Sequence, residues 1–296
     1  MTQTKEKMTK AYRVAQEMLK DRLKDVDQSM AEEFDELNES DIVIVRGTYD
    51  FIEQVFNGIG LKYKIVSVEA LDTMQLDPEQ IVFINCPGNV SDKALRNLVS
   101  FVEKGGFLFT TDWALKHVIE KGFPGYIRYN GRSTGDEVVR VEILTSDDPF
   151  LKSLIGENDD PQWWLEGSSY PITVLDKDKV EVMVQSKEIK ERHGEPAVFV
   201  SFDHGEGKIY HMISHFYLQR AETRTERHKS EGSNYLSEKL TMDNQRWTKY
   251  KKMGVDDANL AEVEAAYSSS SVMNKILWDK KKKSEEKSKT YDEEKR

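Results

Sequence analysis

The feature that most constrains the fold is an alternation of short β-branched runs with amphipathic helical segments in the first half of the chain. The predicted strands are 42–45, 63–68, 81–84 and 106–111, and the predicted helices between them are 49–60 and 92–104. The connections are short, so consecutive strands most economically lie parallel while the helices cross back over the sheet. The alternation therefore predicts an α/β domain with an open, mostly parallel sheet and helices on both faces.

Ligand sites in such sheets lie at the carboxyl ends of the strands. Arg46 could hold an anionic group there, or it could form a structural ion pair with Asp112 or Asp50. Cys86 could be a reactive thiol, although a buried and inert cysteine is more common. The predicted pocket residues are Arg46, Tyr49, Cys86, Asp112, Trp113 and His215.

Beyond residue 124 the pattern changes to antiparallel strands, with a hairpin over 197–217 that turns at Gly205 and Gly207. His211 and His215 lie four apart on its second strand, where even spacing places both on one face. With Asp112 they could bind a metal. The favoured interpretation is that each makes a structural hydrogen bond, so no metal and no cofactor is predicted.

Aromatic side chains and arginines gather in predicted loops. Tyr126, Arg128 and Tyr129 lie in a loop at 123–132, and Trp163 and Trp164 add apolar area nearby in sequence. Such residues are typical of protein interfaces and ligand platforms. The alternative is a loop folded down as a lid on the core.

Long charged helical segments flank this domain. Apolar residues at helical spacing over 4–37 predict an amphipathic helix, which could pack on its own domain, bind a partner protein or pair with its own copy. The region after 220 is polar and then helical, and its last 18 residues mix both charges, as in a disordered tail. The predicted organisation is an N-terminal helix at 1–38, an α/β domain at 41–219, a helical extension at 220–278 and a charged tail at 279–296.

Composition excludes several classes of protein. The chain has 43 Lys and Arg against 53 Asp and Glu, a net charge of −10, which argues against broad binding to nucleic acid. A single cysteine excludes an intramolecular disulfide and any site with several cysteine ligands. No run approaches the roughly 20 apolar residues of a membrane span, and no signal peptide is visible, so we predict no membrane association and a cytoplasmic location.

The order of these elements resembles that of the class I glutamine-amidotransferase-like superfamily, in particular its trehalose-utilisation-like and related uncharacterised branches. The resemblance covers about 41–219 and implies a flavodoxin-like sheet. The segments that carry it are IVFINCPGNVS (81–91), ALRNLVSFVEKGGFLFTTD (94–112), DDPFLKSL (147–154) and GKIYHMISHFYL (207–218).

The resemblance also implies that the usual nucleophile is missing. Active amidotransferases of this superfamily place a cysteine in the tight turn after the strand that corresponds to 106–111, where backbone N–H groups also stabilise the oxyanion. Here that turn reads TTDW (110–113), with neither cysteine nor serine. Cys86 lies in the turn after the preceding strand, which does not match the nucleophile's position.

The partner residues depart from the family pattern as well. His215 lies on a strand that resembles the one carrying the family histidine, but FY (216–217) follows it where active members have Pro-Glu. The sequence therefore predicts a domain without glutaminase activity and without catalytic residues, acting as a protein-interaction or scaffold module. The alternative is a small-molecule binding protein or hydrolase, with a carbohydrate-related ligand by analogy, that uses a rebuilt pocket at the strand ends.

Overall fold

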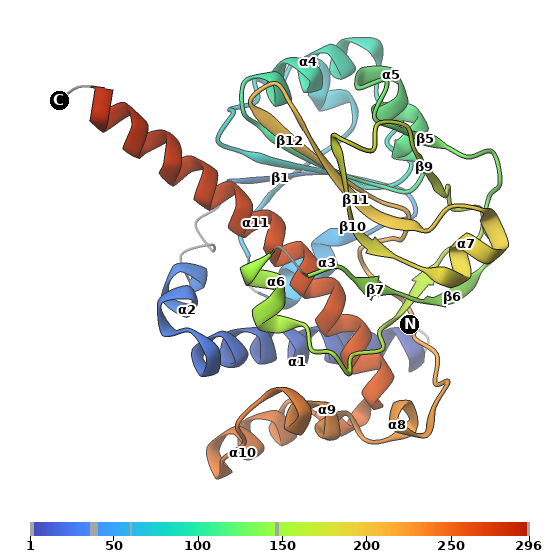
Figure 1. Cartoon of the computed structure of the whole chain (residues 1–296), viewed down its shortest axis with the longest axis vertical. Helices are drawn as coiled ribbons and strands as arrows, with labels where there is room; N and C mark the ends of the chain where they lie inside the picture. The colour runs from blue at the N-terminus through green and yellow to red at the C-terminus, as the bar shows by residue number, and fades with distance from the viewer. Residues whose placement is uncertain (1–2, 36–40, 60, 146–147, 295–296) are drawn as a thin grey trace.

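The computed structural model describes residues 3–35, 41–59, 61–145 and 148–294 (Figure 1). The strands of the main sheet are β1 (Ile42–Val45), β2 (Lys64–Val66), β3 (Ile81–Ile84), β4 (Phe107–Thr111), β7 (Glu142–Ile143), β10 (Val180–Gln185), β11 (Ala197–His204) and β12 (Gly207–Met212). Two small antiparallel sheets pair β5 (Ile127–Tyr129) with β9 (Ile172–Val174) and β6 (Glu137–Arg140) with β8 (Gln162–Leu165).

Helices and helical turns connect and cover these strands. They are α1 (Gln3–Val26), α2 (Gln28–Asp35), α3 (Ile52–Ile59), η2 (Glu69–Asp72), α4 (Asp92–Glu103), the π-helical η3 (Leu115–Ile119), α5 (Glu120–Gly122), α6 (Pro149–Leu154), α7 (Lys187–His193), α8 (Glu226–Lys229), α9 (Gly232–Lys239), α10 (Asn244–Lys252), η4 (Val255–Asp257) and α11 (Leu260–Glu294). None of the described helices is both long and apolar enough to cross a lipid bilayer.

The main sheet has eight strands in the order β2-β1-β3-β4-β12-β11-β10-β7. The five strands from β2 to β12 run parallel, and β11, β10 and β7 continue the sheet in antiparallel pairing. This arrangement confirms the predicted α/β class with an open, mostly parallel sheet. It also brings the carboxyl ends of β3, β4 and β12 side by side.

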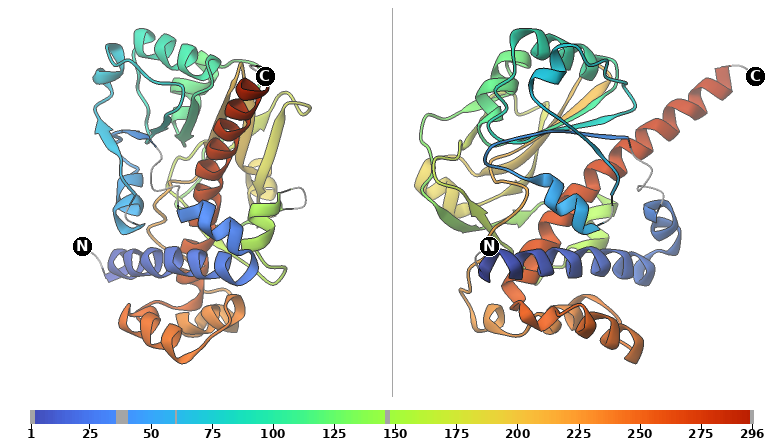
Figure 2. Two further views of the ribbon diagram at one scale, coloured as in Figure 1. Left: turned by 90° about the vertical axis from the view of Figure 1, so that its left-hand side faces the viewer. Right: turned by 180° about the vertical axis from the view of Figure 1, so that it is seen from behind.

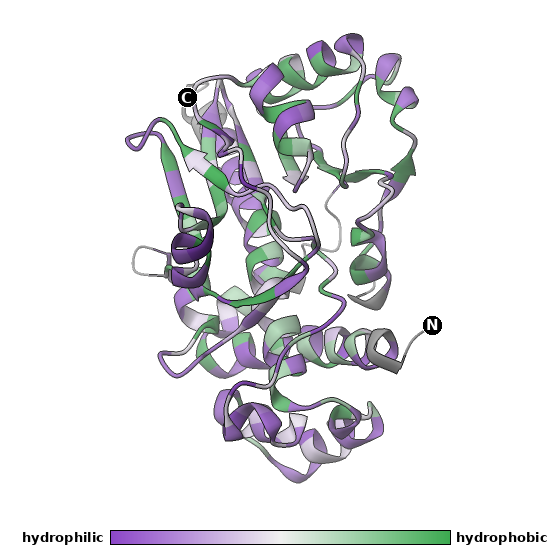
Figure 3. Ribbon diagram, turned by 90° about the vertical axis from the view of Figure 1, so that its right-hand side faces the viewer, coloured by the Kyte–Doolittle hydropathy of each residue, from purple (hydrophilic) through white to green (hydrophobic). Residues whose placement is uncertain are grey.

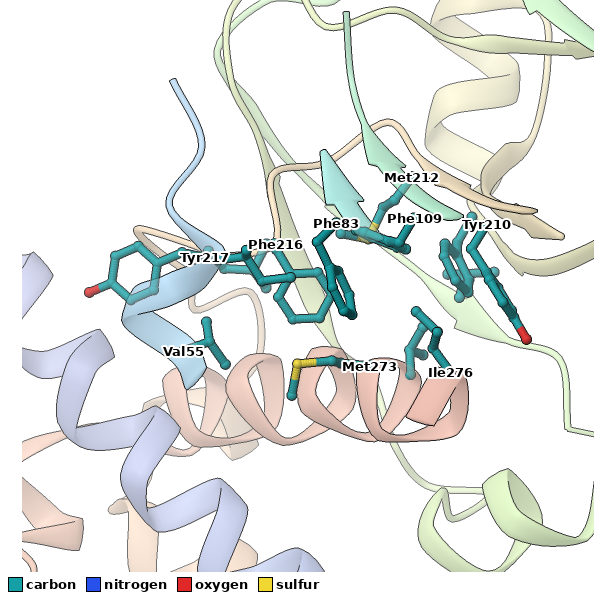
Figure 4. Close-up of a cluster of buried hydrophobic side chains, with 14 of the residues drawn as sticks. Val55, Phe83, Phe109, Tyr210, Met212, Phe216, Tyr217, Met273 and Ile276 are labelled. Carbon is teal, nitrogen blue, oxygen red and sulfur yellow. The ribbon is translucent and has the colours of Figure 1, made fainter. Parts of the chain in front are cut away.

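Helices lie on both faces of the sheet, as the alternation predicts. Phe83 and Phe109 are register partners on one face, where Phe56 of α3 packs edge-on against Phe83. Met273 and Ile276 of α11 lie against the same aromatic layer (Figure 4). On the other face, α4 and α5 cover the sheet (Figures 1 and 2). Apolar residues follow the strands, whereas α7 and the α8–α10 region are largely hydrophilic (Figure 3).

The N-terminal helix packs against the C-terminal helix of the same chain. α1 crosses α11 (Figure 2), and the Tyr12 hydroxyl lies 3.0 Å from Ser269 Oγ while Asn274 Nδ2 donates to Gln16 Oε1 at 3.2 Å. The structure therefore contains the first of the three alternatives for this helix, which is packing against its own chain. The apolar side chains that it buries include Met8, Val14, Met18, Leu19 and Leu23.

The charged segment predicted as a disordered tail is helical instead. α11 continues without a break to Glu294, and residues 295–296 lie outside the described part of the chain. Lys280 Nζ donates to Pro78 O at 2.6 Å, and Lys281 pairs with Glu285 one turn later at 3.2 Å. Lys287 Nζ lies 3.1 Å from Glu206 Oε2, beside the β11–β12 turn. The mixed charges that suggested a solvated tail thus form i,i+4 pairs and contacts with the sheet domain.

Candidate functional site

Three side chains from neighbouring strand ends converge in the interior. Cys86 follows β3, Asp112 follows β4 and His215 follows β12. One donor atom from each lies within 4.8 Å of the other two. All three residues are at most 2% exposed. We refer to these residues as the Cys86–Asp112–His215 cluster.

The backbone holds Asp112 in a sharp turn. Its φ is 45°, a left-handed conformation that aspartate adopts more readily than most residues, and its N–H donates to Met212 O at 2.8 Å. Oδ1 accepts from the Tyr170 N–H at 2.8 Å, and Oδ2 accepts from Ser169 Oγ at 3.2 Å. The Cys86 thiol lies 3.9 Å from Oδ2. The carboxylate is therefore fixed by two neighbours while one oxygen faces the thiol.

His215 lies between two carboxylates. Nε2 is 3.5 Å from Asp112 Oδ2, and Nδ1 is 2.8 Å from Glu166 Oε2. Neither nitrogen is aligned for a hydrogen bond within the described residues, although both are buried. The following residue is held by the buried Asp50 carboxylate, which accepts from the Phe216 N–H at 3.2 Å. The imidazole position is thus set by its own backbone as well as by Glu166.

The Cys86 backbone is also tied to neighbouring strand ends. Its N–H donates to Thr111 Oγ1 at 3.1 Å, and its carbonyl accepts from the N–H groups of Thr48 and Tyr49 at 2.9 and 3.3 Å. These bonds link the ends of β1, β3 and β4, so the thiol stands on a rigid support.

Burial and mutual contact shift the protonation of the whole cluster. Burial raises the pKa of the Cys86 thiol and of the Asp112 carboxyl above their usual values. Burial alone lowers the pKa of His215, but contacts with Asp112, Cys86 and Glu166 outweigh it and hold that pKa well above its usual value. Burial therefore opposes charge on the thiol and on the Asp112 carboxyl, whereas the neighbouring groups favour charge on the imidazole.

An aromatic wall and a loop separate the cluster from the surface. Tyr49 packs edge-on against Trp113 with ring centroids 5.4 Å apart, Trp113 stacks on Tyr170 at 5.7 Å, and Tyr170 stacks on Tyr129 at 4.1 Å. We call these four residues the aromatic wall. Tyr49 is 43% exposed, so the wall reaches the surface.

Residues 166–170 form the cover loop, which lies over the cluster. Ser168 has a φ of 73° and accepts a hydrogen bond from Trp113 Nε1 through its carbonyl at 2.7 Å. Ser169 Oγ lies within hydrogen-bond distance of both Asp112 Oδ2 and Glu166 O. Gly167 and Ser168 are exposed, so the loop has solvent on one side and the cluster on the other.

Arg46, which the sequence also predicts to line the pocket, lies outside the buried cluster. Arg46 is exposed, and within the described part of the chain it forms no ion pair with Asp50 or Asp112. Asp50 and Asp112 accept backbone N–H donors instead. Both structural ion pairs considered for Arg46 are therefore wrong.

Two of the predicted interface residues are core residues. Trp163 and Trp164 lie in β8 and are 0% and 6% exposed, because the strand pairs with β6 and buries both rings. Trp163 Nε1 donates to Ser268 Oγ of α11 at 2.9 Å. Their proposed place in a surface loop is therefore corrected.

The segment predicted as a loop at 123–132 contains the strand β5, so Arg128 and Tyr129 lie in a small antiparallel sheet and not in a loop. Tyr126 stacks on Phe202 at 4.3 Å, Tyr129 belongs to the aromatic wall, and Arg128 is exposed. An interface role for these three residues stays a prediction.

The two histidines of the hairpin do not share a site. β12 ends at Met212, so strand spacing does not extend to His215. His211 is fully buried, its Nδ1 lies 2.8 Å from Thr110 Oγ1, and it is not part of the Cys86–Asp112–His215 cluster.

Sequence reasoning missed Glu166, Ser169 and Tyr170, and it named Asp50 only as a possible ion-pair partner of Arg46. The first three lie in the cover loop, after a strand of a separate small sheet, and no motif or periodicity singles them out. The sequence does point to Asp50 as a site residue. It lies in the segment that follows β1, and ligand sites of open α/β sheets lie at the carboxyl ends of the strands.

A second concavity lies away from the cluster. A cavity of about 780 Å³ at the β7 edge of the sheet is lined by charged side chains of both signs, among them Arg140, Lys152, Asp160 and Glu188. Arg140 and Asp160 pair with each other there, at 2.5 Å.

Comparisons with known proteins give distant structural likenesses only. No protein-family model matches the sequence, and no curated protein matches it either. A glutamine amidotransferase from Thermotoga maritima is 11% identical with a TM-score of 0.42, covering 80% of this chain and 94% of its own. A ThuA-like protein from Bacteroides uniformis is 12% identical with a TM-score of 0.41, covering 60% and 83%.

The comparisons also include glycoside hydrolases. An exo-β-1,4-mannosidase from Opitutaceae bacterium strain TAV5 is 10% identical with a TM-score of 0.42, covering 82% of this chain. The chain spans only 37% of the length of that mannosidase. The fold and the site described above therefore rest on this chain's own contacts.

Proposed function

We propose that this chain binds and processes a small molecule at the carboxyl ends of β3, β4 and β12, with hydrolysis as the class of reaction. The single observation that supports this is the convergence of Cys86, Asp112 and His215 from three adjacent strand ends. Such an edge is where open α/β sheets bind ligands.

Each residue has a distinct task in this proposal. Asp112 and His215 exchange a proton with a bound water or hydroxyl, because a carboxylate and an imidazole 3.5 Å apart form an acid–base pair. Glu166 orients the imidazole from its other nitrogen. Cys86 contacts the same carboxylate and lines the space between the two groups.

The aromatic wall favours a ligand with flat apolar faces and polar edges. Aromatic side chains provide large contact area with little loss of side-chain freedom, and Tyr49 presents an exposed ring beside Trp113. A sugar ring has such faces, so a carbohydrate-related ligand is proposed. Entry requires the cover loop to move, because the cluster itself is at most 2% exposed.

The proposed chemistry differs from that of glutamine amidotransferases. The tight turn after β4 carries Asp112 in place of a thiol or hydroxyl nucleophile. We therefore expect no glutaminase activity, although the sheet order is compatible with a distant relationship to that superfamily.

The test uses the full chain and a panel of sugars, nitrophenyl glycosides and nitrophenyl esters. We expect a ligand from the panel to raise the melting temperature, and a nitrophenyl substrate to be hydrolysed. Asp112→Asn and His215→Gln should each lower turnover by about 100-fold or more, the usual contribution of general acid–base catalysis. Asp178→Asn, a substitution of an exposed aspartate, is the matched control and should leave turnover unchanged. Turnover that survives both cluster substitutions, or no response to any compound, would contradict the proposal.

The competing proposal is an interaction or scaffold module without catalysis. It is supported by the same Asp112 in the turn after β4, since a domain that has lost its nucleophile can keep a binding role. α1 buries its apolar face against α11, so docking through α1 would have to use its polar face. Light scattering of the purified chain separates the two, because this proposal requires self-association or a co-purifying partner and no turnover.

A further inference from the structure

We propose that the Cys86–Asp112–His215 cluster is a binding site for one zinc-type divalent cation. The inference concerns the same site as the proposed function and rests on it for the class of reaction. With zinc bound, Asp112 and His215 would serve as ligands, and a zinc-bound water would take over from them as the group that loses a proton. A thiolate, an imidazole and a carboxylate are the side-chain ligands that zinc takes in proteins.

The spacing of the three donor atoms fits a tetrahedral ion. Around zinc with one ligand of each kind, donor atoms lie about 3.4 to 3.6 Å from one another. Here Asp112 Oδ2 is 3.5 Å from His215 Nε2 and 3.9 Å from Cys86 Sγ. The donor atoms of Cys86 and His215 lie within 4.8 Å of each other, so a contraction of the cluster would bring all three donors to coordination distance.

A buried nitrogen without a hydrogen-bond partner points into this space. His215 is 1% exposed, and its Nε2 has no aligned hydrogen-bond partner within the described residues. A buried polar atom of this kind costs free energy unless a ligand satisfies it. A cation between Nε2, Sγ and Oδ2 would satisfy it.

The surroundings resemble the outer shell of known metal sites. A metal-bound histidine generally places its second nitrogen against a carboxylate, and Glu166 Oε2 lies 2.8 Å from His215 Nδ1. The ligating carboxylate is held in turn, because Asp112 accepts from the Tyr170 N–H and from Ser169 Oγ. Three protein ligands leave a fourth position for water or substrate, the pattern of catalytic rather than structural zinc.

The first experiment measures metal binding by the full chain. Metal is removed with a chelator, the chelator is washed out, and zinc is added back before dialysis. We expect one equivalent of zinc to remain bound after dialysis, measured by elemental analysis. Cobalt(II) in place of zinc should show thiolate-to-cobalt charge-transfer absorption and the visible bands of a tetrahedral ion. The chain has one cysteine, so that absorption can come only from Cys86.

Substitutions then assign the site. Cys86→Ser, Asp112→Asn and His215→Gln should each abolish stoichiometric binding, and Glu166→Gln should weaken it by about 10- to 100-fold. His117→Gln, outside the cluster and on η3, is the control and should bind like the unmodified chain. Circular dichroism checks that each variant is folded. If a variant does not fold, the cobalt spectrum of the unmodified chain still tests whether Cys86 is a ligand.

Failure of this inference can be told apart from failure of the proposed function. No stoichiometric binding, binding without the charge-transfer absorption, or binding that survives all three ligand substitutions would overturn the zinc site. Substrate turnover that depends on Asp112 and His215 in metal-free protein would then still support the proposed function. Zinc bound at the cluster without any ligand response would leave the zinc site supported and the proposed function overturned.

Discussion

Asp112 has a left-handed backbone at the point where β4 turns away from the sheet. A side chain in such a turn is directed back over the strand ends, and here it meets Cys86 and His215 rather than solvent. Aspartate tolerates this conformation better than a β-branched residue would. The local backbone and the composition of the cluster therefore depend on the same residue.

His211 provides a prediction on acid stability. Burial lowers its pKa to about 3, whereas in the unfolded chain it titrates near its usual value of 6.5. Protons therefore bind the unfolded state first, and the contribution of neutral His211 to stability is complete above pH 6.5 and is lost as the pH falls toward 3. We expect the free energy of unfolding to drop by several kcal/mol across that range, at about 1.4 kcal/mol for each pKa unit.

Urea unfolding at a series of pH values measures this effect. The control is His211→Gln, which removes the titrating group, and its stability should fall less steeply over the same range. Parallel pH curves for the two proteins would show that His211 is not the source.

Some residues of the site can be predicted from the sequence and others cannot. Cys86, Asp112 and His215 could be predicted because each follows a recognisable strand, and strand ends gather at one edge of a parallel sheet. Their mutual contact could not, because it depends on β12 inserting beside β4. Glu166 and Ser169 come from the cover loop, which no local pattern identifies.

At the scale of elements, α11 joins the two parts of the molecule. Its middle turns pack on the aromatic face of the sheet (Figure 4), and its first half packs on α1 and α9. Tyr210 of β12 donates its hydroxyl to Asp279 Oδ2 at 2.6 Å, which fixes the helix on the sheet.

Met273 tests how much this packing stabilises the fold. The side chain is fully buried between α11 and the sheet, so Met273→Ala leaves a cavity. We expect a loss of about 2 to 5 kcal/mol in the free energy of unfolding, measured with urea. Lys289→Ala, on the exposed part of the same helix, should change it by less than about 0.5 kcal/mol. Equal effects of the two substitutions would contradict the described packing.

Helical extensions were recognisable at both ends of the chain, but their partners were not. Amphipathic spacing shows that α1 has an apolar face, and it cannot tell whether that face meets another protein or another part of the same chain. The charged end of α11 was misjudged because composition does not reveal that Lys280, 6% exposed, reaches the carbonyl of Pro78.

At the scale of the whole molecule, α1 and α11 cover each other. A chain that begins at Glu39 lacks α1 and α2 and leaves the apolar surface of α11 that faces α1 in water. We expect such a chain to melt at a lower temperature, to bind a hydrophobic dye and to aggregate in size-exclusion chromatography. A folded monomer with an unchanged melting temperature would contradict this, and would show that α1 is dispensable for the fold.

The pairing of α1 with α11 also has a consequence in time. Translation makes α1 before any strand of the sheet and α11 only after every strand. Until then the part of the apolar side of α1 that faces α11 has no intramolecular cover, although α2, α3 and α6 also pack on α1. A nascent chain of this kind is a natural client for a chaperone at the ribosome exit. Completion of this structure is therefore tied to the emergence of α11 rather than to the emergence of the sheet.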